Sequence, residues 1–393
     1  MFLKTYLCLA AAAVSSVSAV RCPLPDFTQQ QIDSGVALTG ISSTALQNSF
    51  GEFKGGCNRN KLKLRQEWRT LAAKDRKSFI SAVKCLQNKP SVFPAGVVPG
   101  SKSFFDDFVF VHMNQTLTIH LTGNFLTWHR YFIHTYEKEL QKCGYNGNLP
   151  YWEWGYDVKA PRNSPVFDGS DTSLGSDGAA VPHQGMQIIF PGATEPLIFQ
   201  PGTGGGCISK GPFKGMLIRL GPAGLPQYGS PNTTSVPDPS QDNPRCVKRD
   251  LNAWVAQKWT SFRNTTELIL FKNTIGTFQS ELTGDPRQST NPVGAHGGGH
   301  YTMGGDPGAD PFISPGDPAF YLHHAQVDRA YWIWQNLDFD NRQGVWGTTF
   351  FFDFIPSPNT TVNDLVDLSP LAPPVTIKSL MNTVGGPLCY AYV

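Results

Sequence analysis

The sequence predicts a mainly α-helical fold in which one helical core carries long loops and a few short strands. Apolar residues recur at three- and four-residue spacing in three stretches, over residues 64–140, 249–282 and 317–335. Residues 155–245 are instead rich in Gly, Pro, Ser, Asn and Thr without a sustained helical period, which is typical of loops with short strands. No internal repeat is present. We therefore expect a single domain rather than two.

The helical stretches have recognisable ends. Helical spacing begins at Leu64, Trp68 and Leu71, continues over residues 79–86, and stops at Asn88-Lys89-Pro90. Apolar runs over residues 104–113 and 125–140 follow, separated by the break and cap Thr122-Gly123-Asn124. The last helix is predicted to open at Asp317-Pro318, an N-cap followed by a proline at the first helical position, and to run to about Gln335.

The chain begins with a secretory pattern. Residues 1–19 contain Lys4, an apolar run over residues 6–14 and the small-residue cleavage site Val17-Ser18-Ala19. That run is too short to span a bilayer, and no other stretch approaches roughly 20 apolar residues. We expect a signal peptide over residues 1–19 and a secreted, extracellular mature domain over residues 20–393, with no membrane partner. Four sequons are candidate glycosylation sites: Asn114, Asn232, Asn264 and Asn359.

The cysteine count and the net charge indicate how the cysteines pair and which partners are excluded. Cys8 lies in the signal segment, which leaves seven of the eight cysteines. In an oxidising compartment most should pair, and an odd number leaves at least one free or bridged to another chain. The formal net charge is only +2, with 16% charged residues and no long basic run. Nucleic acid is therefore not expected as a partner.

Eight of the nine histidines fall into two short windows of the sequence, and only His183 lies elsewhere. Imidazole is the side chain best suited to copper, zinc, iron or nickel, so this clustering predicts metal sites. The clustered residues are His112, His120, His129 and His134 in the first window and His296, His300, His323 and His324 in the second.

In the first window, His112 and His120 would lie about 12 Å apart along one helix, too far to share a metal ion unless the chain turns between them. The break at residues 122–124 leaves His120 on a loop and His129 inside the next helix, so the three imidazoles can converge. His134 should point about 140° away from His129. We interpret it, like His183, as an ordinary polar histidine.

In the second window, His296 and His300 stand one helical turn apart, separated by three glycines that each cost about 0.8–1.0 kcal/mol relative to alanine. Metal binding or packing must therefore hold this turn in shape. A zinc-protease motif would require Glu at the position of Gly297. The third ligand should be His323 or His324, and periodicity does not choose between them. Asp328, one turn after His324, could orient that imidazole or the nearby chain.

Two sites of histidines without a carboxylate indicate a redox metal that prefers neutral nitrogen donors, and copper fits best. A dizinc or di-iron hydrolase would normally include Asp or Glu ligands, and no acidic residue lies between His296 and His300 or beside His120 or His129.

Three stretches then resemble the family of tyrosinases, catechol oxidases and haemocyanins, most closely the short secreted catechol oxidases and tyrosinases of filamentous fungi. They are Phe125-Leu126-Thr127-Trp128-His129-Arg130, Pro150-Tyr151-Trp152-Glu153-Trp154, and the block from Asp317 to Arg329 with its paired histidines.

The resemblance implies a four-helix bundle that holds two copper ions and uses O2 to oxidise o-diphenols to o-quinones. It implies CuA on His112, His120 and His129, CuB on His296, His300 and His324, and Phe320 packed under the site. No catalytic side chain beyond the copper ligands is expected. The expected partners are small phenolic substrates.

Further comparison with the family pattern refines the prediction. Tyr390-Ala391-Tyr392 resembles the motif that closes the family's core domain, and only Val393 follows it, so we expect no C-terminal shielding domain. Thr118 stands where many relatives carry a cysteine linked to the second CuA histidine, so no thioether bridge is expected. Gly297 replaces the Asn that is frequent in efficient monophenol hydroxylases, and Glu281 and Asp285 are not expected to reach the site.

Gly297 favours a catechol oxidase with weak monophenol hydroxylation. The alternatives are a true tyrosinase and an O2 carrier of the haemocyanin kind. A carrier would be expected to cover its copper with a second domain. The sequence leaves the oligomeric state open.

Overall fold

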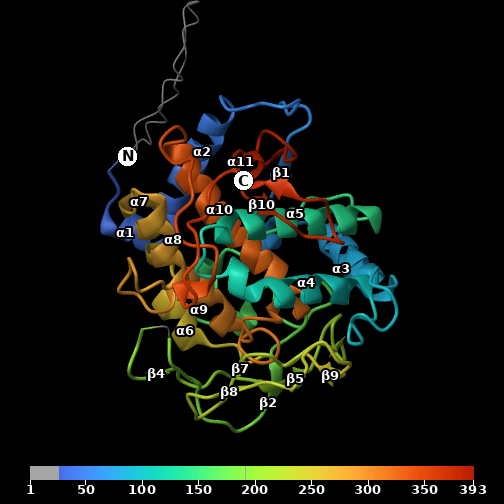
Figure 1. The fold of residues 1–393 in the computed structure, drawn as a ribbon. Coiled ribbons are helices and arrows are strands. Elements are labelled where there is room, and N and C mark those ends of the chain that lie inside the picture. The colour runs from blue at the N-terminus through green and yellow to red at the C-terminus, as the bar shows by residue number, and fades with distance from the viewer. Residues whose placement is uncertain (1–25, 191) are drawn as a thin grey trace, which may run out of the picture.

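The structure is a computed structural model that describes residues 26–190 and 192–393, and helices form its core (Figure 1). The predicted signal segment, residues 1–19, lies outside the described residues, as does Cys22. The mainly α-helical prediction is confirmed. The helices are α1 Gln29–Asp33, α2 Val36–Ser49, α3 Ala73–Asn88, α4 Phe104–Ile119, α5 Phe125–Lys142, α6 Ala253–Trp259, α7 Phe262–Phe271, α8 Ile275–Thr283, α9 Gly294–Met303, α10 Ala319–Leu337 and α11 Ile377–Leu380.

Helix α10 is the centre of the helical core. It packs against α2, α5, α7 and α9. Its residues are buried from Ala319 to Asn336, polar ones included, as expected for a helix surrounded by others on all sides. Helix α4 lies against both α3 and α5. The helices α4, α5, α9 and α10 therefore form the bundle that carries the clustered histidines.

Local hydrogen bonds set the helix ends near the site. Helix α4 opens with a capping box in which Ser103 and Asp106 satisfy each other's backbone N–H groups. It ends at Ile119, so His120 is the first residue outside it. At the start of α10, Asp317 Oδ1 accepts the Ala319 N–H over 2.9 Å. The predicted Asp-Pro start of this helix is therefore confirmed, with its first helical residue one position later.

The segment between α5 and α6 forms the loop layer drawn in green and yellow at the bottom of Figure 1. Arg249, fully buried, holds this layer against α10. It makes a bidentate pair with Asp317, both contacts at 2.7 Å, and donates to the Leu174 carbonyl over 2.9 Å. The strands, which pair antiparallel two by two, are β2 Gly178–Ala180 with β5 Gly205–Ile208, β3 Gln187–Ile188 with β4 Leu197–Ile198, β6 Leu217–Ile218 with β9 Arg245–Cys246, and β7 Leu225–Pro226 with β8 Thr233–Thr234.

Two helix predictions were wrong in detail. Residues 64–71 do not form an α-helix. Lys63–Arg65 is strand β1, which pairs in parallel with β12 Tyr390–Tyr392, and a short 3-10 helix, Trp68–Thr70, follows. The backbone N–H and C=O groups of this strand pair with β12 near the end of the chain, and the local spacing of apolar residues does not indicate such a distant partner.

The stretch 249–282 contains three helices, because Ser261 and Thr274 each start a new helix with a capping box. Helix α2 was not predicted at all. Its buried face includes Ser42 and Ser49, which weakens the apolar period.

Disulfides join segments that are separated along the chain. The six cysteines in the described part of the chain pair as Cys57–Cys389, Cys85–Cys143 and Cys207–Cys246. The last antiparallel pair of strands, β10 Leu365–Val366 with β11 Val375–Thr376, lies near α11. Among the described residues no helix combines the length and apolar character needed to cross a membrane.

Candidate metal centre

Three imidazoles from two helices and the turn between them form the first group. His112 comes from α4, His120 from the turn after it and His129 from α5, and their ligand nitrogens all lie within 4.8 Å of one another. The Nε2 atoms of His112 and His129 are 3.5 Å apart. The predicted convergence of helix, loop and helix is therefore what the structure shows.

Backbone carbonyls fix the tautomer of each ring in this group. The Nδ1 atoms of His112, His120 and His129 lie 2.8, 3.0 and 2.8 Å from the carbonyl oxygens of Phe312, Thr116 and Phe125. A carbonyl only accepts, so each Nδ1 carries the proton and each Nε2 keeps a free lone pair. Lone pairs that converge in this way repel one another unless a cation lies among them, so the geometry fits a metal ion.

The second group contains His296 and His300 on α9 with His323 and His324 on α10. His300 Nε2 lies 3.1 Å from His296 Nε2 and 3.2 Å from His324 Nε2. His323 makes no comparable nitrogen contact, and both of its ring nitrogens are buried without a hydrogen-bond partner. The geometry therefore favours His324 as the third member, although His323 lies close by.

Packing explains the glycines between His296 and His300. A Cβ on Gly299 would overlap the His323 ring, and one on Gly298 would lie 2.6 Å from Trp259 Cβ. These two positions let α9 approach α10 and α6 closely, which offsets the low helix propensity of glycine.

The two groups face each other. The rings of His129 and His324 stack with centroids 4.5 Å apart, and those of His120 and His296 lie 6.1 Å apart. Phe320 stacks on His324 at 4.1 Å and also lies 5.5 Å from His112, so it contacts both groups. The arrangement can hold two metal ions side by side.

Burial sets the protonation of these imidazoles. It lowers the pKa of His120 to about 4 and that of His300 to about 3, with carbonyl hydrogen bonds acting weakly in the opposite direction. The pKa values of His112, His129, His296 and His324 are also lowered, chiefly by burial. The rings are thus neutral donors at pH 7, and neither group includes a carboxylate. Neutral nitrogen ligands of this kind suit copper.

A cavity of about 340 Å³ opens beside both groups. His120, His296 and His300 form its floor together with Gly297, and none of the Asp, Glu, Lys or Arg residues in the described part of the chain lines it. Its remaining walls come from segments distant in the chain, including Ile188, Ile189, Phe190, Val293, Tyr301 and Phe351. An uncharged aromatic ring would fit this cavity next to the imidazoles.

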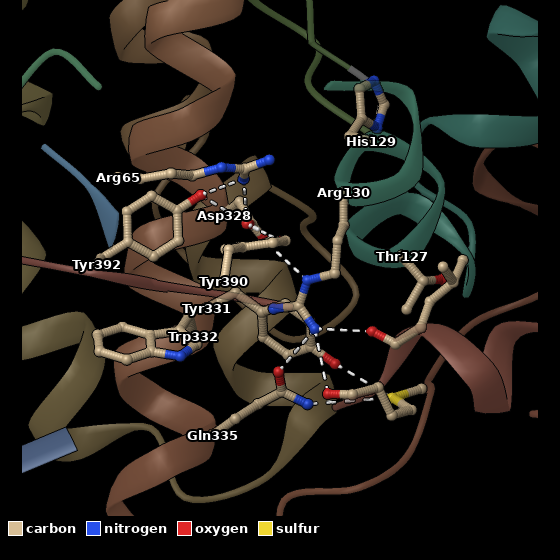
Figure 2. Close-up of polar contacts among 12 residues, drawn as sticks. Arg65, Thr127, His129, Arg130, Asp328, Tyr331, Trp332, Gln335, Tyr390 and Tyr392 are labelled. Atoms are coloured by element: carbon tan, nitrogen blue, oxygen red, sulfur yellow. Dashed lines mark hydrogen bonds and ion pairs between the residues drawn. The ribbon is translucent and has the colours of Figure 1, made fainter. Parts of the chain in front are cut away.

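Asp328 does not contact the His324 imidazole. Figure 2 shows it among Arg65, Arg130, Tyr390 and Tyr392, while His129 points away from this cluster. Arg130 Nε donates to Asp328 Oδ1 over 2.6 Å, and both tyrosine hydroxyls donate to Oδ2 over 2.6 Å. Asp328 therefore orders the helices behind the site rather than an imidazole.

The remaining predicted residues lie outside the two groups. His134 lies 3.7 Å from Glu137, and His183 lies 3.2 Å from Asp250. Asn114, Asn232 and Asn359 are exposed, whereas Asn264 is half-buried and its side chain caps α7. Neither Glu281 nor Asp285 lines the cavity.

Sequence patterns did not reveal most of the cavity walls. Ile188 ends the short strand β3, Ile189 and Phe190 follow it without a motif, and Phe351 begins a short 3-10 helix beyond α10. Tyr301 and Leu121 had a usable signal, because each directly follows a clustered histidine, His300 or His120.

Comparison with known proteins agrees with this centre. A model of the common central domain of tyrosinase matches residues 102–337. Tyrosinase P of Aspergillus terreus is 38% identical over 336 residues, covering 84% of this chain and 91% of that protein. N-acetyl-6-hydroxytryptophan oxidase of Emericella nidulans is 35% identical over 350 residues, covering 86% and 93%. A glycine-to-asparagine variant of a Thermothelomyces thermophila polyphenol oxidase superposes with a TM-score of 0.83 and 38% identity, covering 91% and 97%.

The fold and the facing histidine groups define a dicopper oxidase of the type-3 class. The chain belongs to the tyrosinase family. It is accordingly an oxidoreductase whose cofactor is a pair of copper ions and whose co-substrate is O2.

Proposed function

We propose that the chain is a secreted catechol oxidase, which converts o-diphenols to o-quinones. His112, His120 and His129 hold CuA, and His296, His300 and His324 hold CuB. The observation that carries this proposal is the convergence of buried, neutral Nε2 atoms in two groups that share one cavity. The copper pair supplies the redox chemistry, in which two catechols lose four electrons and four protons, and one O2 becomes two waters.

The chain's own residues bind and orient the phenol. The cavity has apolar walls and an imidazole floor. A catechol ring therefore packs against the apolar side chains while both of its oxygens point to the metal centre. Phe320 lies behind this floor and keeps His324 in its rotamer through ring stacking at 4.1 Å. The six ligands need no proton exchange with substrate, because burial already keeps them neutral.

Diphenols are favoured over monophenols because the cavity lacks a group that would remove a proton from an incoming phenol. Asp285 is held by Arg287 through contacts of 2.6 and 3.0 Å. Glu281 accepts from Ser289 and Asn291 and pairs with Lys272 at 3.1 Å. A phenol with a pKa of about 10 is only about one part in a thousand ionised at pH 7. Without a base, ionising it therefore costs roughly 4 kcal/mol.

Secretion is part of the proposal. The pattern of residues 1–19 supports it, and so do the three disulfides, because such bonds persist in oxidising compartments. Expression in a filamentous fungus with and without residues 1–19 tests it. The full chain should accumulate in the medium, and an intracellular full-length product would contradict secretion.

The function is tested by O2 uptake with 4-methylcatechol, with tyramine and with no phenol, on protein that contains measured copper. Rapid uptake with the catechol and slow uptake with tyramine support a catechol oxidase. Equal rates identify a tyrosinase. Reversible O2 binding without quinone formation identifies a carrier, and both of those results contradict the proposal.

A further inference from the structure

Arg287, in the connection between α8 and α9, contacts the turn that presents His120. Its NH2 group donates to the Leu121 carbonyl over 2.8 Å, and Leu121 directly follows His120. The same guanidinium forms a forked pair with Asp285, which is 1% exposed and so holds the arginine in place. The guanidinium thus joins a fixed anion to the backbone beside a copper ligand.

The turn needs such support. Leu121 has φ +51°, a left-handed conformation that is uncommon for any residue with a side chain other than Asn, Asp or His. Gln279 adds two hydrogen bonds, from Nε2 to the Thr122 carbonyl over 3.0 Å and to the Trp346 carbonyl over 3.1 Å. A strained conformation of this kind persists only where surrounding contacts enforce it.

The guanidinium also lies beside the segment that carries Phe351, a residue of the cavity wall. Its carbon lies 5.0 Å from the Trp346 ring centre and 5.4 Å from that of Phe352. Phe352 precedes Asp353 in a second left-handed turn and follows Phe351, which lines the cavity. A Cβ on Gly192 would lie 3.9 Å from the Phe352 ring.

We propose that Arg287 is a positioning residue that holds the strained Leu121 turn, and with it the His120 imidazole, in the geometry that CuA requires. Through its contact with Phe352 it also steadies the neighbouring Phe351, which lines the cavity. This inference rests on the proposed ligand role of His120. Arginine suits the task because its planar fork binds the Asp285 carboxylate and a carbonyl at the same time, which the single ammonium of lysine does not reproduce.

The experiment measures how fast copper leaves the holoenzyme into excess bathocuproine disulfonate with ascorbate. In Arg287→Ala, one copper equivalent should leave on the order of tenfold faster than in the parent, and the other at the parental rate. Arg287→Lys should release this copper equivalent at a rate between those of the parent and Arg287→Ala. Arg263→Ala is the matched control, since it removes an exposed forked pair with Asp33 far from the site and should release copper as the parent does.

A rescue separates positioning from general stability. In the Arg287→Ala background, Leu121→Asn should recover part of the lost copper retention, because asparagine adopts left-handed backbone more readily than leucine. The KM for 4-tert-butylcatechol should also rise in Arg287→Ala by a larger factor than kcat falls.

Three results would overturn the proposal: parental release rates in Arg287→Ala, equal acceleration of both equivalents with a lower apoprotein Tm, or no rescue by Leu121→Asn. If Arg287→Ala does not fold, the same comparisons apply to Arg287→Lys and its Leu121→Asn partner. A parent that binds no copper would contradict the proposed function instead.

Discussion

Arg130 and Asp328 form a buried ion pair, with Arg130 Nε 2.6 Å from Asp328 Oδ1, that joins the helices carrying His129 and His324. Arg130 directly follows His129, and Asp328 lies one turn beyond His324. The pair therefore holds the helix positions of His129 and His324, one proposed ligand of each copper ion, relative to each other. Arg65 adds a second guanidinium, which contacts Asp328 at 3.4 Å and Glu137 at 2.6 Å.

Replacing Asp328 by asparagine should lower the free energy of unfolding by about 3–5 kcal/mol, because Arg130 would remain buried without its counter-ion. Urea denaturation at pH 7 measures the change. Asp33→Asn, which breaks an exposed pair with Arg263, is the matched control and should change stability little. An Asp328→Asn variant as stable as the control would contradict the structural role of this pair.

The same pair predicts a pH dependence. Burial alone would raise the pKa of Asp328, but Arg130 and Arg65 outweigh it, so this pKa lies below the usual value. A carboxyl whose folded pKa is lowered stabilises the fold fully above its unfolded pKa of about 3.9 and loses that contribution as the pH falls further. The stability difference between parent and Asp328→Asn should stay constant from pH 7 to 5 and shrink below about pH 4. A difference that shrinks already between pH 7 and 5 would contradict the lowered pKa.

Gly297→Asn should increase the rate on tyramine relative to 4-methylcatechol. A Cβ at this position would lie 3.1 Å from Val293 Cγ1 and 3.7 Å from Tyr301, so an asparagine fits after a small shift and its amide reaches the cavity. There it can hold a water near an incoming phenol. Initial rates and lag phases on both substrates measure the effect. No gain on tyramine would remove this explanation and leave the copper assignment untouched.

Catechols with charged substituents should react more slowly than uncharged ones. Among the described residues no Asp, Glu, Lys or Arg lines the cavity, and its imidazoles are neutral, so an ammonium or carboxylate group would lose hydration without gaining an ionic partner. The kcat/KM for dopamine should be on the order of tenfold below that for 4-methylcatechol, which corresponds to about 1.4 kcal/mol. Equal values for the two would show that the substituent stays in solvent.

Single histidine-to-alanine substitutions test the ligand assignment through the copper content of each variant. Alanine at any of the six proposed ligands should remove one copper ion, whereas His134→Ala and His183→Ala should keep both, because those rings lie near Glu137 and Asp250 instead. His323→Ala should also retain both ions. Loss of a full copper equivalent from His134→Ala or His183→Ala would overturn the assignment.

Sequence spacing was sufficient wherever one segment determines the geometry. The break at residues 122–124 placed His120 on a turn and His129 in a helix, and the four-residue step placed His296 and His300 on one face. The strand at Lys63–Arg65 was missed because its partner is the chain end, and Arg287 was missed because its role depends on Leu121, Trp346 and Phe352. The choice between His323 and His324 likewise needed the position of α9 relative to α10.

Copper content and O2 uptake, measured on the same preparation of the parent protein, test the central claim most directly. We predict two copper ions per chain and one O2 consumed for every two molecules of 4-methylcatechol oxidised, with both copper and activity lost after chelation and restored by copper alone. A protein that binds fewer than two copper ions, or that binds two and consumes no O2 with a catechol, would contradict a dicopper catechol oxidase.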